Sequence, residues 1–159
     1  MENIIEIKDS KIITNIINRS FMTIALQYNL TKENAPRHAA FINHDVIETQ
    51  LNKGFKMYGY TINGQLVGCV GYWIDDNEIN HIERLATLPE YRHLGIEKKL
   101  IGFIENIIME NGGKIAEIHV MDKNIKLIEW YKKLKYSITR INELKHFPFN
   151  SCVMNKILN

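Results

Sequence analysis

The chain has 159 residues, of which 45% are hydrophobic and 24% are charged, and its formal net charge at neutral pH is +2. This length and balance are typical of one globular domain whose core is large enough to fold without disulfides or a structural metal. The small positive excess argues against a nucleic-acid-binding protein, and no apolar run is long enough to cross a membrane. The N-terminal residues lack the features of a secretory signal, so we expect a cytoplasmic protein without membrane or nucleic-acid partners.

The first third of the chain predicts one strand and two helices. Residues 3–8 alternate enough for a short strand, and Ser10 is the predicted cap of a helix over 11–29. The apolar residues of that helix recur every three or four positions, which indicates one buried face. After a connector, a shorter helix over 44–53 ends at Gly54.

The rest of the chain predicts a hairpin followed by crossover connections. Asn63-Gly64 is a strong signal of a two-residue turn between two strands. Antiparallel hairpins early in this part and a strand-helix-strand crossover later predict an α/β domain with a mixed sheet. The predicted strands cover 55–62, 65–74, 78–87, 114–121, 136–142 and 151–158, and the predicted helices cover 95–111 and 124–134.

The cysteines and histidines do not indicate a disulfide or a metal centre. Cys69 and Cys152 lie far apart, each in an apolar, strand-like stretch, which favours two reduced and buried thiols. None of the six histidines stands at a clear ligand-pair spacing from a cysteine or a carboxylate. We therefore predict that the chain binds no metal.

The most informative segment, residues 82–96, runs from a predicted strand through a turn into the start of a helix. Arg92-x-x-Gly95 lies at that turn, where free amides and the helix dipole favour a phosphate or a pyrophosphate. Gly95 permits close approach of the backbone, and Arg92, Lys98 and Lys99 would add positive charge. By itself, this spacing fits an ordinary strand-to-helix turn equally well.

Two runs of residues, together with the order of elements, resemble the GNAT superfamily of acetyl-CoA-dependent N-acetyltransferases. The first is Leu-Ala-Thr-Leu-Pro-Glu-Tyr-Arg over 85–92, ahead of Gly95. The second is Asn124 followed by Glu-Trp-Tyr-Lys-Lys-Leu-Lys-Tyr over 129–136, which is similar to the family's fourth-helix pattern. The His-Phe-Pro-Phe loop over 146–149 is similar to that of a bacterial subgroup.

The resemblance covers about residues 55–158 and implies a fold. That fold is a three-layer α/β/α domain with a mixed, mostly antiparallel sheet of six to seven strands. A V-shaped splay between the fourth and fifth strands would hold acetyl-CoA. One domain would then fill 1–159, with a variable acceptor side in 1–54 and a cofactor-binding core in 55–159. A homodimer is plausible from the family.

The resemblance also implies which residues bind the cofactor. Main-chain amides of the third hairpin strand would pair with the pantetheine arm, and the loop before the helix would hold the pyrophosphate. This sequence departs from the family pattern, because Glu97 stands where a small residue is usual and His93 replaces a frequent glycine. A carboxylate there would repel the pyrophosphate by about a kcal/mol or more unless it points outward or a lysine compensates it. The implied cofactor-binding residues are Leu85, Ala86, Thr87, Arg92, His93, Leu94, Gly95, Ile96, Glu97, Lys98, Asn124 and Tyr131.

Acetyl transfer to an amine needs a base, an oxyanion donor and an acid. Glu83 resembles the family's base position, and strand alternation puts His81 on the same face, where it could relay a proton through water. Either residue could instead be an ordinary polar strand residue. Tyr131 lies where the family carries its acid, although its helical stripe also fits core packing. A main-chain amide near Leu85 is the expected oxyanion donor.

The acceptor side is specified only by residue type. Aromatic and histidine side chains suit an organic amine, and a small molecule is favoured over a protein tail. A catalytically inactive CoA-binding or acyl-CoA-binding module is the alternative hypothesis, and an interaction protein with the fold alone is a third. The candidate acceptor residues are His38, Phe41, Tyr72, Trp73, His81, His146 and Phe147.

Overall fold

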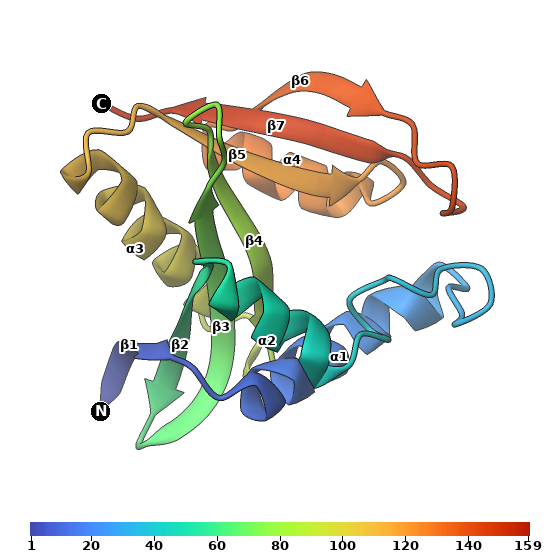
Figure 1. Cartoon of the computed structure of the whole chain (residues 1–159), viewed down its shortest axis with the longest axis horizontal. Helices are drawn as coiled ribbons and strands as arrows, with labels where there is room; N and C mark the ends of the chain where they lie inside the picture. Colours follow the sequence, from blue (N-terminus) through green and yellow to red (C-terminus); the bar gives the residue numbers. More distant parts are fainter.

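Seven strands form one open sheet in the computed structural model, which describes residues 1–159 (Figure 1). The strands are β1 (Glu2–Ile7), β2 (Lys56–Ile62), β3 (Gln65–Ile74), β4 (Asn80–Thr87), β5 (Ile115–Met121), β6 (Ser137–Asn142) and β7 (Ser151–Ile157). The helices are α1 (Ser10–Gln27), α2 (His44–Asn52), α3 (Ile96–Glu110) and α4 (Ile125–Lys133), with one 3-10 turn at Pro89–Tyr91. No helix has the length and apolar character needed to cross a membrane.

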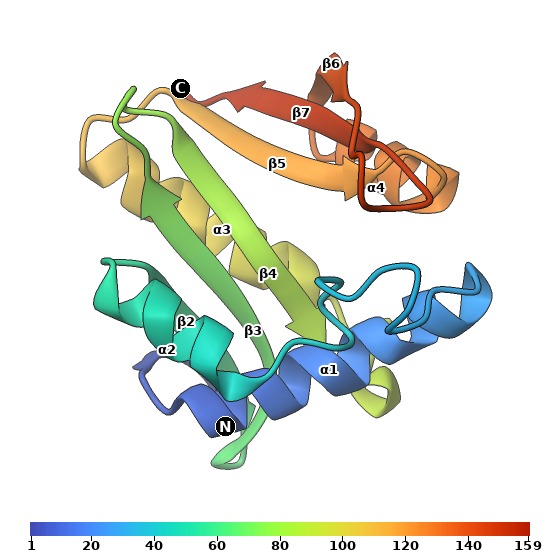
Figure 2. The same ribbon diagram turned by 45° about the vertical axis from the view of Figure 1, so that its right-hand side comes forward.

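The order of strands in the sheet is β1-β2-β3-β4-β5-β7-β6. All neighbours are antiparallel except β4 and β5, which are parallel. β4 and β5 pair at only two positions, Asn80 with Ala116 and His81 with Glu117. Beyond these positions the two strands diverge, as Figure 2 shows. The predicted mixed sheet with a splay between its fourth and fifth strands is therefore confirmed.

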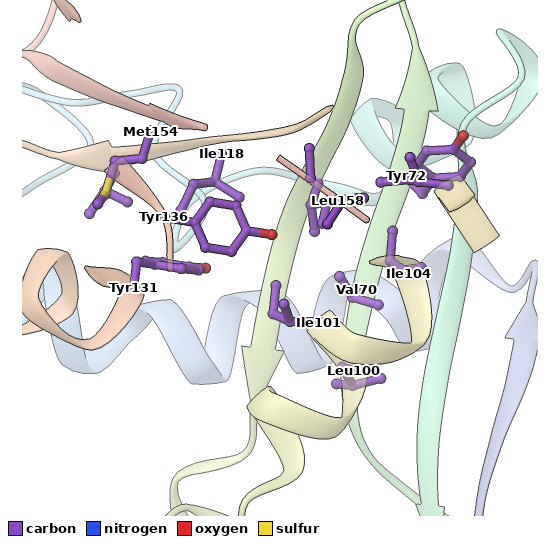
Figure 3. Packing of buried hydrophobic residues seen from close by; sticks show 14 of the residues in the cluster. Val70, Tyr72, Leu100, Ile101, Ile104, Ile118, Tyr131, Tyr136, Met154 and Leu158 are labelled. Carbon is purple, nitrogen blue, oxygen red and sulfur yellow. The ribbon is translucent and has the colours of Figure 1, made fainter. Parts of the chain in front are cut away.

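Helices cover both faces of the sheet. On one face, α3 and α4 pack on an apolar cluster that includes Val70, Leu100 and Ile118. Figure 3 shows Tyr131 of α4 lying beside Tyr136 in this cluster. On the other face, α1 and α2 form a second cluster with the alternate residues of β3 and β4, such as Cys69 and Ala86. The three layers follow from the alternation of side chains along β3 and β4.

The observed elements match the predicted ones within two residues at each end, and the Asn63-Gly64 turn joins β2 to β3 as predicted. The predicted cap of α1 is wrong by one position. The cap is Asp9, whose carboxylate accepts hydrogen bonds from the amides of Lys11 and Ile12, and Ser10 is the first helical residue. Aspartate competes well for this position because its carboxylate satisfies the free amides of the first turn.

Cys69 and Cys152 are both buried and neither forms a disulfide, as predicted. Burial raises the pKa of the Cys69 thiol to about 12. This thiol stays protonated near neutral pH and fills space in the core.

Candidate active site

A β-bulge interrupts β4 where the splay opens. Ala86 pairs with Cys69 and Glu83 pairs with Gly71, so Arg84 and Leu85 together face a single residue of β3. Arg84 has a φ of +55°, which is unusual for a residue with a side chain. A bulge of this kind bends a strand and redirects its side chains.

The main chain after the bulge faces the gap between β4 and β5. The Thr87 amide donates to Ser20 Oγ of α1 at 3.2 Å, so it points away from β3. Alternation counted back from Thr87 and Ala86 predicts that the Leu85 amide, at the bulge, also points away from β3. It is a hydrogen-bond donor beside the open part of the splay. The Thr87 hydroxyl is also buried without a hydrogen-bond partner.

The loop before α3 leaves the helix N-terminus free of side-chain caps. His93 and Gly95 both have left-handed backbones, with φ of +66° and +76°. No side chain caps the helix, so its first amides have no partner from a capping residue. A Cβ at Gly95 would meet no protein atom within 4 Å. Glycine is therefore needed here for the backbone conformation, and the space beside it is free for a ligand.

The charged side chains of this loop point in different directions. Arg92 donates to Thr23 Oγ1 at 2.9 Å and to the Ser20 carbonyl at 2.7 Å, so its guanidinium is held against α1. Lys99 donates to Glu2 at 2.6 Å and lies beside β1 instead of the loop. Of the predicted positive charges, only Lys98 is exposed without such a partner. The idea that Lys99 compensates a carboxylate in the loop is therefore wrong.

Tyr131 projects from α4 into the apolar cluster under the splay (Figure 3). Its ring contacts Tyr136 edge to face, with the ring centroids 5.5 Å apart. Burial raises the pKa of Tyr131 above its usual range, and the charge of Glu97 raises it further. Tyr131 is therefore protonated near neutral pH, and the half-buried Glu97 lies within electrostatic reach of its phenol.

Asn124 is the cap of α4. Its Oδ1 accepts from the Leu127 amide at 3.2 Å, and its Nδ2 donates to no protein group. The residue is buried, with 8% of its surface exposed. Asn124 thus fixes the start of α4 and keeps one amide donor free beside β5.

Glu83 and His81 lie on the face of the sheet that carries α1 and α2, opposite to Tyr131. Glu83 is half-buried and forms no ion pair within 4 Å. His81 stacks on Trp73 at 4.3 Å and hydrogen-bonds to Asp75 at 3.0 Å. Strand alternation puts His81 and Glu83 on one face as predicted, but the hydrogen bonds of His81 lead away from Glu83.

A polar network surrounds the buried carboxylate of Glu117 at the closed end of the splay. His119 lies 2.9 Å from this carboxylate, and His81 lies 3.8 Å from it. These three side chains are of the kind that binds divalent cations, and their ligand atoms lie within 4.8 Å of one another. The guanidinium of Arg140 already lies 3.3 Å from the same oxygen. Glu117 and its neighbours therefore form a hydrogen-bonded network. The absence of a metal stays a prediction.

The candidate acceptor residues fall into separate groups. His38 packs between Phe21, Phe41 and Phe149, with ring centroids 5.9 to 6.4 Å apart. Trp73 is stacked between Phe55 and His81 at the other end of β4. Phe147 contacts Phe149, and His146 is exposed in the loop before β7. Tyr72 donates to Asn80 inside the apolar cluster on which α3 and α4 pack.

The expectation that Tyr72 lines the acceptor side is therefore wrong, because strand alternation turns it to the opposite face. The sequence analysis also missed Arg84. Burial lowers the pKa of Arg84, and the charge of Glu83 opposes that shift. Burial lowers the pKa of His38, and the charge of Arg84 lowers it further, so the guanidinium is within electrostatic reach of this ring. No sequence signal marks the bulge that puts it there, apart from Gly71 on the facing strand.

A splayed β4–β5 pair, a bulge beside it and an uncapped helix N-terminus follow one another at this edge of β4. A free helix N-terminus is a favourable place for a phosphate. A family model described as the acetyltransferase (GNAT) family matches residues 18–136. This chain belongs to that family, and it is an acyltransferase that transfers acetyl groups.

Solved structures agree with this assignment at the level of the fold. The chain is similar to the ribosomal-protein-S18-alanine N-acetyltransferase of Escherichia coli, with a TM-score of 0.77, 13% identity and coverage of 100% of this chain and 95% of that one. It is similar to a GNAT acetyltransferase of Staphylococcus aureus, with a TM-score of 0.74, 20% identity and full coverage of both chains. It is also similar to the paia N-acetyltransferase of Thermoplasma acidophilum, solved in complex with coenzyme A, with a TM-score of 0.73, 18% identity and 99% coverage of both chains.

Proposed function

We propose that this acetyltransferase moves the acetyl group of acetyl-CoA to the primary amine of a small molecule, by direct attack when both are bound. The observation that carries the proposal is the slot between β4 and β5. Its two strands separate after His81 and Glu117, and the free N-terminus of α3 lies next to the loop that follows β4. In this proposal the amine and the thioester meet in the gap between the two faces of the sheet.

The residues of the slot fit acetyl-CoA. Amides at the start of α3 and the open space at Gly95 suit its pyrophosphate. The buried Thr87 hydroxyl and the free Asn124 amide offer polar groups to its pantetheine arm. Glu97 is the one group that opposes binding, because a carboxylate in the first turn lies near the expected phosphates. Acetyl-CoA supplies an acetyl group activated as a thioester.

Three groups of this chain would carry the chemistry. Glu83 accepts the proton of the attacking amine from the α1 face. The Leu85 amide donates a hydrogen bond to the carbonyl oxygen, where negative charge develops. Tyr131 donates its phenolic proton to the departing sulfur from the opposite face, and its raised pKa keeps that proton in place until the sulfur becomes negative. The new N–C bond forms as the C–S bond breaks.

A measurement of CoA thiol release with a broad panel of primary amines tests this function. We expect turnover with part of the panel, and we expect Tyr131→Phe to lower kcat about 100-fold without changing acetyl-CoA binding. Tyr58→Phe is the matched control, because Tyr58 packs on Phe103 away from the slot and should keep full turnover. Acetyl-CoA binding without thiol release from any amine would instead be the behaviour of a binding module. Equal turnover of the two variants would remove Tyr131 as the acid.

A further inference from the structure

Arg84 is the one half-buried arginine of the chain whose side chain has no hydrogen-bond or ion-pair partner. Arg19 pairs with Glu90, Arg92 bonds to α1 and Arg140 bonds to Glu117, whereas Arg37 is exposed to solvent. The Arg84 side chain makes no hydrogen bond and no ion pair within 4 Å, and its Nε is buried without an acceptor. A buried donor without a partner is costly, and a bound anion would satisfy it.

The backbone holds Arg84 in place against its own preference. Its φ of +55° lies in the left-handed region. Arg84 is the first residue of the bulge and directly follows Glu83, which pairs with Gly71 of β3. A Cβ on Gly71 would lie 2.9 Å from Met57 Sδ and 3.2 Å from the Glu83 carbonyl, so glycine there lets β3 pack closely against both β2 and the strand that carries the bulge. Strained residues of this kind persist where the surrounding structure fixes them, and they cluster at binding sites.

The surroundings of Arg84 suit a small organic anion. The backbone amide of Ala40 donates to Nδ1 of His38 at 3.2 Å, so the proton of the neutral ring is on Nε2, a hydrogen-bond donor. Burial, and then the charge of Arg84, lower the pKa of His38 and favour this neutral form. Phe21, Phe41 and Phe149 pack around the same ring. A cation without a partner therefore lies within electrostatic reach of a neutral donor that is surrounded by aromatic rings.

We propose that Arg84 binds the carboxylate of the acceptor, and that the acceptor is therefore a small amino acid or a close derivative with a free carboxylate. This inference rests on the proposed acetyl transfer. The guanidinium fork matches a carboxylate with two parallel hydrogen bonds. The neighbouring Glu83 carboxylate attracts the ammonium group of the same molecule, so adjacent residues of β4 recognise the two charges of a zwitterion.

The charge balance favours a carboxylate over a phosphate. Arg84 is the cation at this end of β4 whose side chain has no hydrogen-bond partner, since Arg92 donates to Thr23 and Ser20 of α1 and the lowered pKa of His38 favours its neutral form. A phosphate carries close to two negative charges and would leave one unpaired beside Glu83. A carboxylate carries one charge, which a single guanidinium neutralises.

Matched pairs of acceptors test the inference on the full chain. Each amino acid of a panel is compared with its carboxamide, which keeps the amine and removes the negative charge. We expect kcat/KM to be 10- to 100-fold higher for the acid, mostly through KM. Thermal unfolding in the presence of CoA gives a second readout that needs no turnover, and there the acid should stabilise the protein more than the amide.

Two variants assign the preference to a residue. Arg84→Asn removes the cation and retains a residue that tolerates a left-handed backbone, so it should fold and should lose the preference for the acid. Arg37→Asn makes the same change at an exposed position and should keep the preference. Equal kcat/KM and equal stabilisation for acid and amide, or a preference that survives in Arg84→Asn, would overturn the inference. If amides and neutral amines are acetylated as well as acids, the acetyl transfer stands and only the carboxylate site fails.

Discussion

The two sides of the splay are built from different parts of the chain. The proposed cofactor side consists mainly of consecutive main-chain groups, from the bulge in β4 through the left-handed loop to the first turn of α3. The proposed acceptor side consists of side chains from three distant segments, with His38 before α2, Arg84 in β4 and Phe149 before β7. Local backbone geometry therefore defines the first side, and tertiary packing defines the second.

This difference extends to electrostatics. On the cofactor side, the positive end of α3 is opposed by Glu97, a negative residue in its own first turn. On the acceptor side, Glu83 and Arg84 stand next to each other without forming an ion pair. Changes to the cofactor side should therefore alter acetyl-CoA binding without changing the response to acceptors, and changes to the acceptor side should alter the response to acceptors and to pH.

Gly95→Ala is expected to have the largest effect among changes to the cofactor side. An alanine with a φ of +76° costs about 1–2 kcal/mol in the folded protein, and its methyl group would enter the space left for the pyrophosphate. Acetyl-CoA affinity should fall more than tenfold, as measured by thermal shift. Gly102→Ala, inside α3, also meets no atom within 4 Å and should instead stabilise the protein by about 0.5–1 kcal/mol with unchanged affinity. If both variants weaken binding equally, the free helix N-terminus is not the phosphate site.

Glu97→Gln should have a smaller effect, in the opposite direction. Removing the negative charge should tighten acetyl-CoA binding about fivefold, or about 1 kcal/mol, and the gain should shrink as salt is added. The free protein should lose a few tenths of a kcal/mol, because a negative residue in the first turn favours the helix. Glu110→Gln, at the other end of α3, should leave acetyl-CoA affinity unchanged. Unchanged binding in Glu97→Gln would show that this carboxylate points away from the phosphates.

The sequence predicts the cofactor side well because local rules govern it. The spacing of apolar residues and turn signals such as Asn63-Gly64 predict the bounds of each strand and helix to within two residues. Gly95 directly marks the loop before α3. Apart from Gly71 on the facing strand, nothing in the sequence marks the bulge, because Arg84 looks like any polar strand residue and its left-handed backbone depends on the fold. The sequence also assigned Tyr72 to the acceptor side, since residue type alone does not say which face of a strand is covered.

The smallest expected effect concerns His38 on the acceptor side. Burial and the charge of Arg84 lower its pKa, so between that lowered value and about 6.5 the unfolded chain binds more protons than the folded one. The free energy of unfolding should therefore fall as the pH drops below about 6.5. His38→Asn, whose Oδ1 can still accept from the Ala40 amide, should flatten this dependence in urea titrations at several pH values. Arg84→Asn should flatten it partly, because burial remains. Parallel curves for wild type and His38→Asn would show that another group controls acid stability and that the guanidinium does not act on this ring.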